Sequence, residues 1–248
     1  MKNVTKTCIF LLMLVFTASM VSAQNQAAKI ETLSKAELQL MQKHAGITVH
    51  PNYQEPDGLM ATPITSFPFF ANFEDGNIPA EFDAQPGSNA DVRTDADAAY
   101  QSSYGLLFEG NTSTGWGSTP YSYSAAFDPS KSTHFGTVLI DVVPSGSSGV
   151  LKMQFMLQQG YSFNTNYNWF RVLVDGSLFP DEDGGPGYYQ ALNPVNYMGE
   201  WAEKTWDLSS YQGGGQFQIT LQSSCKYYED YYQSGDVVHI DDFQIWYM

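Results

Sequence analysis

The chain has 248 residues and a formal net charge of −15, from 26 acidic residues against 11 Lys and Arg. Such an excess of carboxylates argues against binding to nucleic acid or to anionic membranes, because both reward clusters of Lys and Arg. It is compatible with bound divalent cations and with solubility outside the cell.

The N-terminal residues have the pattern of a secretory signal peptide. Lys2 and Lys6 precede a short apolar run, Cys8–Phe16, and small residues end the segment at Ser22-Ala23. The run is too short to span a bilayer comfortably, so we expect cleavage near Ala23 and no membrane insertion. The mature protein is then expected to be secreted, or to lie at the cell surface or in the periplasm.

Removal of residues 1–23 changes both the charge and the cysteine count. It takes away two lysines and no acid, so the mature charge is 9 − 26 = −17. Only Cys225 is left, which excludes an intramolecular disulfide. A secreted domain of this kind needs a sizeable core, or a metal that fastens part of the fold.

Residues 24–66 differ in texture from the rest of the chain. Ser34-Lys35-Ala36-Glu37 is a capping box, which predicts a short helix near 34–45. Four prolines between residues 50 and 68 then predict an extended linker. We therefore divide the chain into a signal peptide (1–23), a helical and proline-containing leader (24–66) and one β-domain (67–248).

From Phe67 onward the sequence alternates between short β-type runs and turn signals. Leu151, Met153, Phe155 and Leu157, for example, occupy alternate positions and predict one buried strand face. Short strands at this spacing predict an all-β, two-sheet antiparallel sandwich. The predicted strands are Phe69–Glu74, Tyr104–Glu109, Ser122–Phe127, Gly136–Val143, Val150–Leu157, Trp169–Val174, Glu203–Leu208, Gln216–Leu221 and Val237–Trp246.

The last predicted strand carries two adjacent carboxylates, Asp241 and Asp242, among β-branched and aromatic residues. A strand that buries apolar neighbours has little use for such a pair unless its charge is compensated. Two interpretations are open: the pair binds a hard cation, or it accepts hydrogen bonds from nearby backbone N–H groups.

Five short motifs along the domain resemble one known family. The opening motif Phe73-Glu74-Asp75-Gly76-x-Ile78-Pro79 and the closing Ile240-Asp241-Asp242-Phe243 resemble the two ends of the MAM-like, cleaved-adhesin ("choice-of-anchor J"-type) domains of secreted Bacteroidota proteins. The intervening motifs are similar at residues 103–110, 170–176 and 206–211. The resemblance implies a jelly-roll sandwich of the concanavalin A or galactose-binding type.

The resemblance also implies a structural Ca²⁺ where the first and last strands meet. Carried over by position, Glu74 and Asp241 are the expected ligands, with Asp75 and Asp242 as further candidates. Oxygen-only ligands suit Ca²⁺. The alternative is that Asp75 belongs only to its turn and that one of the final pair faces solvent. The family's Asp-Gly-Asp-Gly calcium run is missing, and Asp91, Asp95 and Asp97 are only a loose substitute.

Tyrosines and tryptophans gather in the predicted loops. Flat apolar rings beside hydrogen-bonding groups suit a sugar ring or a peptide surface, so these residues are the candidate ligand face. The alternative is that about half of them close the ends of the core. The candidates are Tyr227, Tyr228, Tyr231, Tyr232, Trp116, Tyr188 and Tyr189.

Catalytic motifs are weak in this sequence. It contains no Gly-x-Ser-x-Gly and no His-Glu-x-x-His, and Glu81-Phe82-Asp83 lacks the further Glu of jelly-roll glycan hydrolases. The four histidines show no metal-type spacing, and His239 reads as a sheet residue. We therefore expect a non-catalytic binding or adhesion module for carbohydrate or a host or cell-surface protein. The alternatives are a glycan hydrolase or lyase and a self-assembling surface protein.

Overall fold

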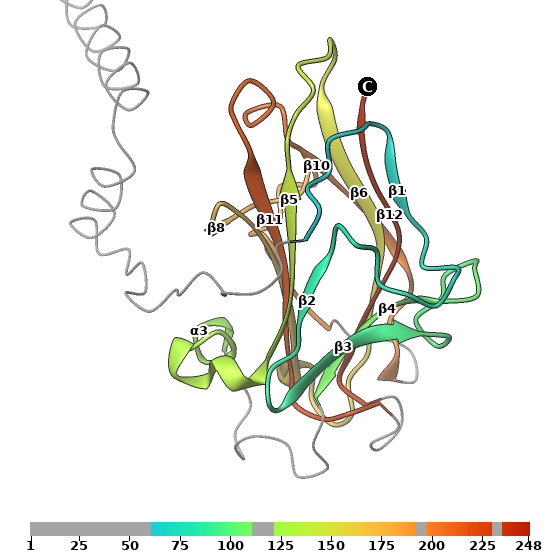
Figure 1. Cartoon of the computed structure of the whole chain (residues 1–248). Coiled ribbons are helices and arrows are strands. Elements are labelled where there is room, and N and C mark those ends of the chain that lie inside the picture. The colour runs from blue at the N-terminus through green and yellow to red at the C-terminus, as the bar shows by residue number, and fades with distance from the viewer. Residues whose placement is uncertain (1–60, 111–121, 192–196, 230–234) are drawn as a thin grey trace, which may run out of the picture. The chain divides into compact units, whose positions relative to one another are not determined.

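The computed structural model describes residues 61–110, 122–191, 197–229 and 235–248 (Figure 1). The chain divides into two compact units, Met1–Asp57 and Gly58–Met248, and every described residue belongs to the second unit. The predicted signal peptide and the predicted helix near 34–45 lie outside the described residues. No helix in the described ranges has the length and apolar character that crossing a membrane requires.

One sheet, here called sheet 1, is antiparallel throughout and contains the last strand of the chain near its centre. Strand β1 pairs with the C-terminal half of β12, beyond the point where β4 pairs with its N-terminal half. The order is β10 (Ala202–Asp207), β6 (Leu151–Gln159), β12 (Val237–Tyr247), β4 (Gly105–Gly110) and β3 (Ala90–Asp95), with β1 (Phe69–Ala71) on β12.

The second sheet, sheet 2, is also antiparallel and faces sheet 1 across the core. Its order is β2 (Asp83–Gln85), β5 (Phe135–Val142), β11 (Phe217–Cys225), β7 (Asn168–Val174) and β8 (Ser177–Leu178), with β9 (Tyr188–Gln190) also on β7. The prediction of an all-β, two-sheet antiparallel sandwich is thereby confirmed.

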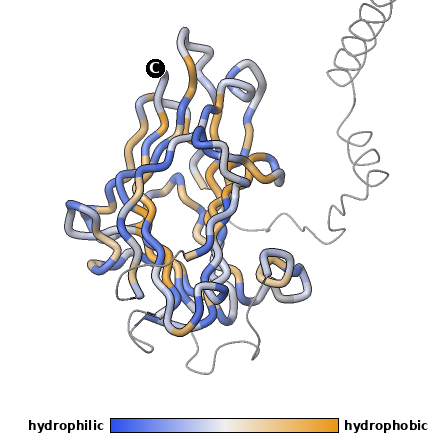
Figure 2. The backbone as a smooth tube through the Cα atoms, turned by 180° about the vertical axis from the view of Figure 1, so that it is seen from behind, coloured by the Kyte–Doolittle hydropathy of each residue, from blue (hydrophilic) through white to orange (hydrophobic). Residues whose placement is uncertain are grey.

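The core lies between the sheets and follows the alternation along each strand. In β6 the predicted face, from Leu151 to Leu157, is buried, and the intervening Lys152 and Gln154 face outward. Trp206 of β10 stacks on Phe155 with ring centroids 4.5 Å apart. Figure 2 shows the same alternation as a change between orange and blue along the strands. The alternation of side chains along each strand therefore determines which residues face outward, where a ligand can reach them.

One predicted strand is wrong. Residues Tyr123–Ala126 form the short helix α3, because Ser122 adopts an extended conformation and its hydroxyl caps the backbone N–H of Ala125. Short 3₁₀ helices follow at η1 (Pro129–His134) and η2 (Thr165–Tyr167). Helix α3 lies against the outer side of sheet 2, where Tyr123 contacts Trp169 of β7.

The described domain also packs residues that precede the first predicted strand. Ile64 is buried in the core, and its backbone exchanges hydrogen bonds with Asp141 O and Val143 N at the edge of sheet 2. Strands β2, β3 and β9 lie in stretches where the sequence predicts loops. Their alternating patterns are too short to predict strands from the sequence. Hydrogen bonding to a neighbouring strand defines them instead.

Candidate functional site

The pairing of β1 with β12 brings the two ends of the domain together, as the predicted cation site requires. Ala71 lies opposite Phe243, and Glu74 follows three residues after Ala71. The ladder between β12 and β6 is irregular between Asp241 and Gln244, and Asp242 adopts a positive φ of 51° within this bulge. The bulge points the two neighbouring carboxylates in different directions.

Asp241 is fully buried, and protein groups satisfy its carboxylate. Oδ2 accepts hydrogen bonds from the backbone N–H of Tyr100 at 2.8 Å and from the hydroxyl of Ser102 at 2.5 Å, and Oδ1 accepts one from Asp242 N at 2.8 Å. The hydrogen-bonding interpretation of this acid is therefore realised in the structure. It ties the segment before β4 to the last strand.

Asp241 and Glu74 lie close enough to Asp242 for their charges to act on its carboxylate. The Glu74 carboxylate accepts a hydrogen bond from Ser103 N at 3.0 Å, in the segment that also contacts Asp241. Burial, followed by the charges of Asp241 and Glu74, raises the pKa of Asp242. Among the described residues, no Lys or Arg forms an ion pair with any of these three acids. In this part of the chain, no cationic side chain offsets the repulsion that Asp241 and Glu74 exert on Asp242.

Asp75 is turned away from this group. Its carboxylate accepts a hydrogen bond from Asn77 N at 3.0 Å, and the bonds from Asn77 lower the pKa of Asp75. This is the local turn that the sequence left as the alternative for Asp75.

Another carboxylate group, Asp95, Asp97 and Glu229, is more compact: its ligand oxygens lie within 4.8 Å of one another. Sequence reasoning noted Asp95 and Asp97 but not Glu229, which reaches them from the segment between β11 and β12.

The predicted ligand-face aromatics occupy different environments. Tyr189 packs on the core side of β9, and Tyr188 lies on the outer side. The Tyr189 hydroxyl donates to Asp181 at 2.9 Å, and burial and this contact raise the pKa of Tyr189. Tyr189 is therefore partly buried against the core. Three of the candidates, Trp116, Tyr231 and Tyr232, lie outside the described residues.

Tyr227 and Tyr228 follow β11 at one end of the sandwich. Tyr227 packs edge-on against Phe163 and Tyr167, with ring centroids 5.9 and 6.1 Å away. The buried Lys226 ammonium lies 4.0 Å from the Tyr167 ring centroid and 5.1 Å from that of Tyr227. These rings thus shelter a buried cation. Tyr228 retains 37 % of its surface exposed.

The outer face of sheet 2 carries a transverse row of side chains in register, one from each of five strands. We call this set the polar row. Its members, in order across β2, β5, β11, β7 and β9, are Gln85, Thr137, Gln222, Arg171 and Tyr188. Because the strands are hydrogen-bonded to one another, the spacing of these side chains is set by the sheet.

Hydrogen bonds connect the centre of the polar row. Arg171 Nε donates to Gln222 Oε1 at 2.9 Å, and Gln222 Nε2 donates to Thr137 Oγ1 at 2.9 Å. Another guanidinium nitrogen of Arg171 donates to the Tyr123 hydroxyl at 3.2 Å. The row is thereby held in one arrangement from β5 to helix α3.

Aromatic rings border the polar row on the side of helix α3. Tyr188 stacks on Tyr123 with ring centroids 4.2 Å apart, and Trp169 packs against both rings. The Arg171 guanidinium lies 4.0 Å from the centroid of the Phe127 ring. Burial lowers the pKa of Arg171. In the described part of the chain, no carboxylate forms an ion pair with this arginine.

Sequence reasoning identified only Tyr188 of this row as a ligand residue. The other members are common polar residues on separate strands, and only the register between strands reveals that they are neighbours. The neighbouring row contains Leu139, Thr220 and Leu173, which are between 7 % and 9 % exposed although they face outward. The outer face of sheet 2 thus combines half-buried polar groups with sheltered apolar ones.

Comparisons with known proteins give distant structural likenesses. No family model matches the chain, and no curated protein matches it. The K1 cleaved adhesin domain of Lys-gingipain from Porphyromonas gingivalis W83 is similar with a TM-score of 0.41 and 15 % identity, over 73 % of this chain and 98 % of that one. Cleaved-adhesin domains are thus among the structures that this chain resembles.

Two further solved structures have a similar arrangement. The CBM22-1 xylan-binding domain from Paenibacillus barcinonensis Xyn10C has a TM-score of 0.39 and 17 % identity, over 72 % of this chain and 92 % of that one. The enzymatically active domain of the bacteriophage CBA120 tailspike protein 4 has a TM-score of 0.40 and 9 % identity, over 71 % of this chain and 20 % of that one.

Proposed function

We propose that this domain is a non-catalytic binding module that recognises carbohydrate on the outer face of sheet 2. The observation that carries the proposal is the polar row, in which Arg171 and Gln222 are locked beside the Tyr188 and Tyr123 rings. Binding sites commonly combine aromatic walls with a few fixed polar groups. Polar groups on strands are also more precisely placed than groups on loops.

The polar row offers donors and acceptors of the kind that sugar hydroxyls need. A primary amide carries two N–H donors and a carbonyl acceptor, so Gln222 retains capacity after its bonds to Arg171 and Thr137. Arg171 has five N–H donors and no carboxylate partner among the described residues. A ligand that accepts hydrogen bonds from this guanidinium would replace part of its lost hydration.

Two carboxylates, Asp83 and Asp141, also face outward on this sheet. Each accepts a hydrogen bond from a glutamine: Gln85 donates to Asp83 at 2.8 Å, and Gln218 donates to Asp141 at 3.1 Å. We assign them to ligand binding, as acceptors for sugar hydroxyls, and not to acid–base catalysis.

We also propose a structural Ca²⁺ bound by Glu74, Asp241 and Asp242, in a protein exported through its N-terminal signal. The charges of Asp241 and Glu74 act on Asp242 with no ion-paired Lys or Arg among the described residues, which fits an oxygen-only ion site. Phe73 and Asp242 have positive φ angles of 55° and 51°, so the backbone turns sharply on both sides of the group. The ion would fasten the opening of the domain to its last strand.

The binding proposal is tested with a glycan array, followed by calorimetry on the best glycan. We expect Arg171→Ala and Gln222→Ala each to weaken binding by at least about tenfold, the equivalent of losing one well-placed polar contact. Gln154→Ala is the matched control, because Gln154 is a half-buried outward glutamine on β6 of the other sheet. Equal loss in the control, or full binding by both row variants, would refute the assignment of the face.

The alternative functions give different outcomes in the same experiments. Release of reducing ends from the bound glycan, abolished in Asp83→Asn or Asp141→Asn, would identify a hydrolase. If no glycan on the array binds above background, and the mass measured by size-exclusion chromatography rises with protein concentration, a self-assembling protein would be favoured.

A further inference from the structure

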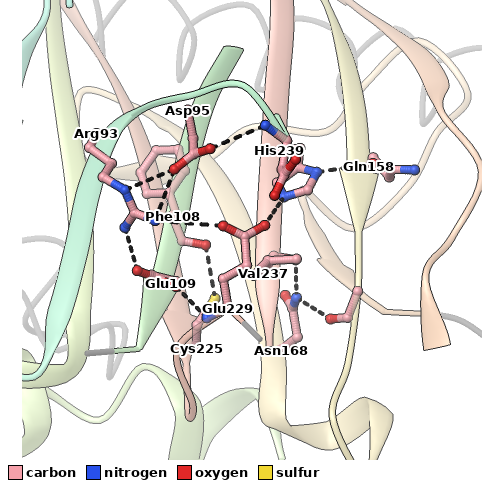
Figure 3. A network of polar contacts seen from close by, with 12 residues as sticks. Arg93, Asp95, Phe108, Glu109, Gln158, Asn168, Cys225, Glu229, Val237 and His239 are labelled. Atoms are coloured by element: carbon pink, nitrogen blue, oxygen red, sulfur yellow. Dashed lines mark hydrogen bonds and ion pairs between the residues drawn. The ribbon is translucent and has the colours of Figure 1, made fainter. Parts of the chain in front are cut away.

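The outer face of sheet 1 contains a second row of side chains that the proposed function does not use. In register across β3, β4, β12 and β6 lie Arg93, Leu107, His239 and Gln158. Figure 3 shows Arg93, His239 and Gln158 of this row, together with Asp95 and Glu229. Its residues surround a group of acids on the side of the sandwich opposite the polar row.

Arg93 binds several of these acids through one oxygen each. Its guanidinium contacts Asp95 Oδ2 at 3.0 Å and Glu229 Oε2 at 3.6 Å. This leaves Oε1 as the Glu229 oxygen that faces His239. The carboxylates of Asp95, Asp97 and Glu229 approach one another within 4.8 Å.

Glu109 positions Glu229 in this group. The buried Glu109 accepts hydrogen bonds from Arg93 through one oxygen and from the backbone N–H of Glu229 through the other. The backbone that carries Glu229 is therefore tied to strand β4, and its side chain is directed back over the sheet.

His239 directs one ring nitrogen at Glu229, a member of this group. Gln158 Nε2 donates to Gly199 O at 2.7 Å, so Gln158 Oε1 is the atom that faces His239 Nδ1 at 3.0 Å. An oxygen of this kind only accepts, and Nδ1 therefore carries a proton. His239 is 1 % exposed, and its Nε2 has no hydrogen-bond partner. It points at Glu229 Oε1, 3.6 Å away.

We propose that Asp95, Asp97, Glu229 and the Nε2 atom of His239 form a binding site for a divalent transition ion of the zinc class. The charge balance supports a cation: among the described residues, Arg93 is the one arginine in a group that contains the carboxylates of Asp91, Asp95, Asp97, Glu109 and Glu229. A lone pair on His239 Nε2 that faces the Glu229 carboxylate would destabilise the folded protein in this buried place, unless a proton or a metal ion lies between the two atoms.

The ligand chemistry selects the class of ion. Imidazole with carboxylates suits Zn²⁺ and its neighbours, whereas Ca²⁺ takes oxygen ligands. Two ligands on a tetrahedral Zn²⁺ with bonds of about 2.0–2.1 Å are about 3.3–3.4 Å apart, close to the separation of the His239 and Glu229 atoms. The hydrogen bond from Nδ1 to Gln158 is the outer-shell contact that metal-bound histidines commonly make.

The site differs in position and chemistry from the proposed calcium site. His239 and Asp241 are both on β12, but they have different neighbours. The Asp241 carboxylate accepts hydrogen bonds from Tyr100 and Ser102, whereas His239 faces Glu229. A protein that binds both ions would therefore distinguish them by ligand type.

The test is a titration of the metal-free mature protein with Zn²⁺, followed by calorimetry and by NMR of the histidine ring nitrogens. We expect one equivalent to bind, a large shift of the His239 Nε2 signal with little change at Nδ1, and no displacement by excess Ca²⁺. Substitutions His239→Gln and Asp97→Asn should each weaken Zn²⁺ binding by at least about tenfold.

His134→Gln is the matched control, because His134 ends η1 on the side of sheet 2, and it should bind Zn²⁺ as the wild type does. Asp97 is exposed, so Asp97→Asn should fold even if the change at buried His239 does not. Unchanged Zn²⁺ binding in Asp97→Asn, or an Nε2 signal that does not move, would overturn the proposal. Loss of binding in His134→Gln would place the ion elsewhere and overturn it equally.

Discussion

Neutralising Glu74 should separate the cation role of the domain's two ends from their hydrogen-bond role. Glu74→Gln retains an oxygen that can accept from Ser103 N but removes one of the two charges that act on Asp242. With Ca²⁺ at about 100 times its Kd, an ion bound only by the folded state contributes about 2.7 kcal/mol. In a domain of this size that raises Tm by about 5–10 °C.

The variant should lose most of this rise. If removal of one carboxylate ligand weakens Ca²⁺ binding about a hundredfold, the same Ca²⁺ concentration contributes only about 0.4 kcal/mol, or about 1–2 °C. Without Ca²⁺ the wild type should no longer melt at a higher temperature than the variant, because Glu74→Gln relieves the repulsion of Asp242. The metal-free variant should then melt at the same temperature as the metal-free wild type or above it.

The assay is calorimetric unfolding in chelated buffer and across a Ca²⁺ series. Asp75→Asn is the control, since Asp75 bonds to its own turn, and it should keep the full Ca²⁺ response. A wild type that melts identically with and without Ca²⁺ would refute the cation site, and Asp241 would then act only through its hydrogen bonds. A full response in Glu74→Gln would refute the assignment of this ligand.

Three further predictions follow from buried groups. Trp206→Phe removes the indole that donates to Phe179 O at 3.1 Å and leaves a smaller ring against Phe155; urea unfolding should show a loss of about 2–4 kcal/mol. Burial raises the pKa of Asp236 to about 7, so its contribution to stability is full below about pH 4 and is lost as the pH rises through 7. Over that range the free energy of unfolding of the wild type should fall, relative to Asp236→Asn, by an amount on the order of 4 kcal/mol. Parallel pH profiles for the two proteins would contradict this. Cys225 is fully buried and its pKa is raised by burial, so a thiol reagent should label it only after denaturant is added; rapid labelling of the native mature protein would contradict its burial.

The fold could be predicted from the sequence where long strands bury alternate residues. Strand β6 shows this best, because Leu151 to Leu157 supply a continuous apolar face. The prediction failed at Ser122–Phe127, where the Ser122 cap starts a helix that packs on the sheet from outside. Its two aromatics, Tyr123 and Phe127, are four residues apart, a spacing that places them on one face of a strand and also on one face of a helix.

The candidate sites were less predictable, and for a physical reason. The acids at the two ends of the domain stand out because Asp241 and Asp242 interrupt an apolar strand. The polar row and the His239 group depend instead on register, which places Gln222 beside Arg171 and Leu107 between Arg93 and His239. A shift of one residue in any of these ladders would turn the side chains to the core, and the sequence does not state the register.

The two outer faces of the sandwich should act independently of each other. The proposed glycan face lies on sheet 2 and the proposed cation sites lie on sheet 1, with the core between them. Face-to-face sheets are about 10 Å apart, and side chains on the two outer faces are separated by more than that. We therefore expect an ion near Asp241 or His239 to leave the polar row in its arrangement, even though the ion stabilises the domain as a whole.

Calorimetry of glycan binding well below the Tm, with the cations present and then chelated, measures this independence. We expect Kd values within about twofold of each other, which corresponds to a coupling free energy of less than about 0.4 kcal/mol. The matched measurement at a temperature near the metal-free Tm should show apparent coupling, since chelation then unfolds part of the protein. A tenfold change well below the Tm would mean that cation binding rearranges sheet 2, and that the polar row is not held by the ladders and by Gln222 as described.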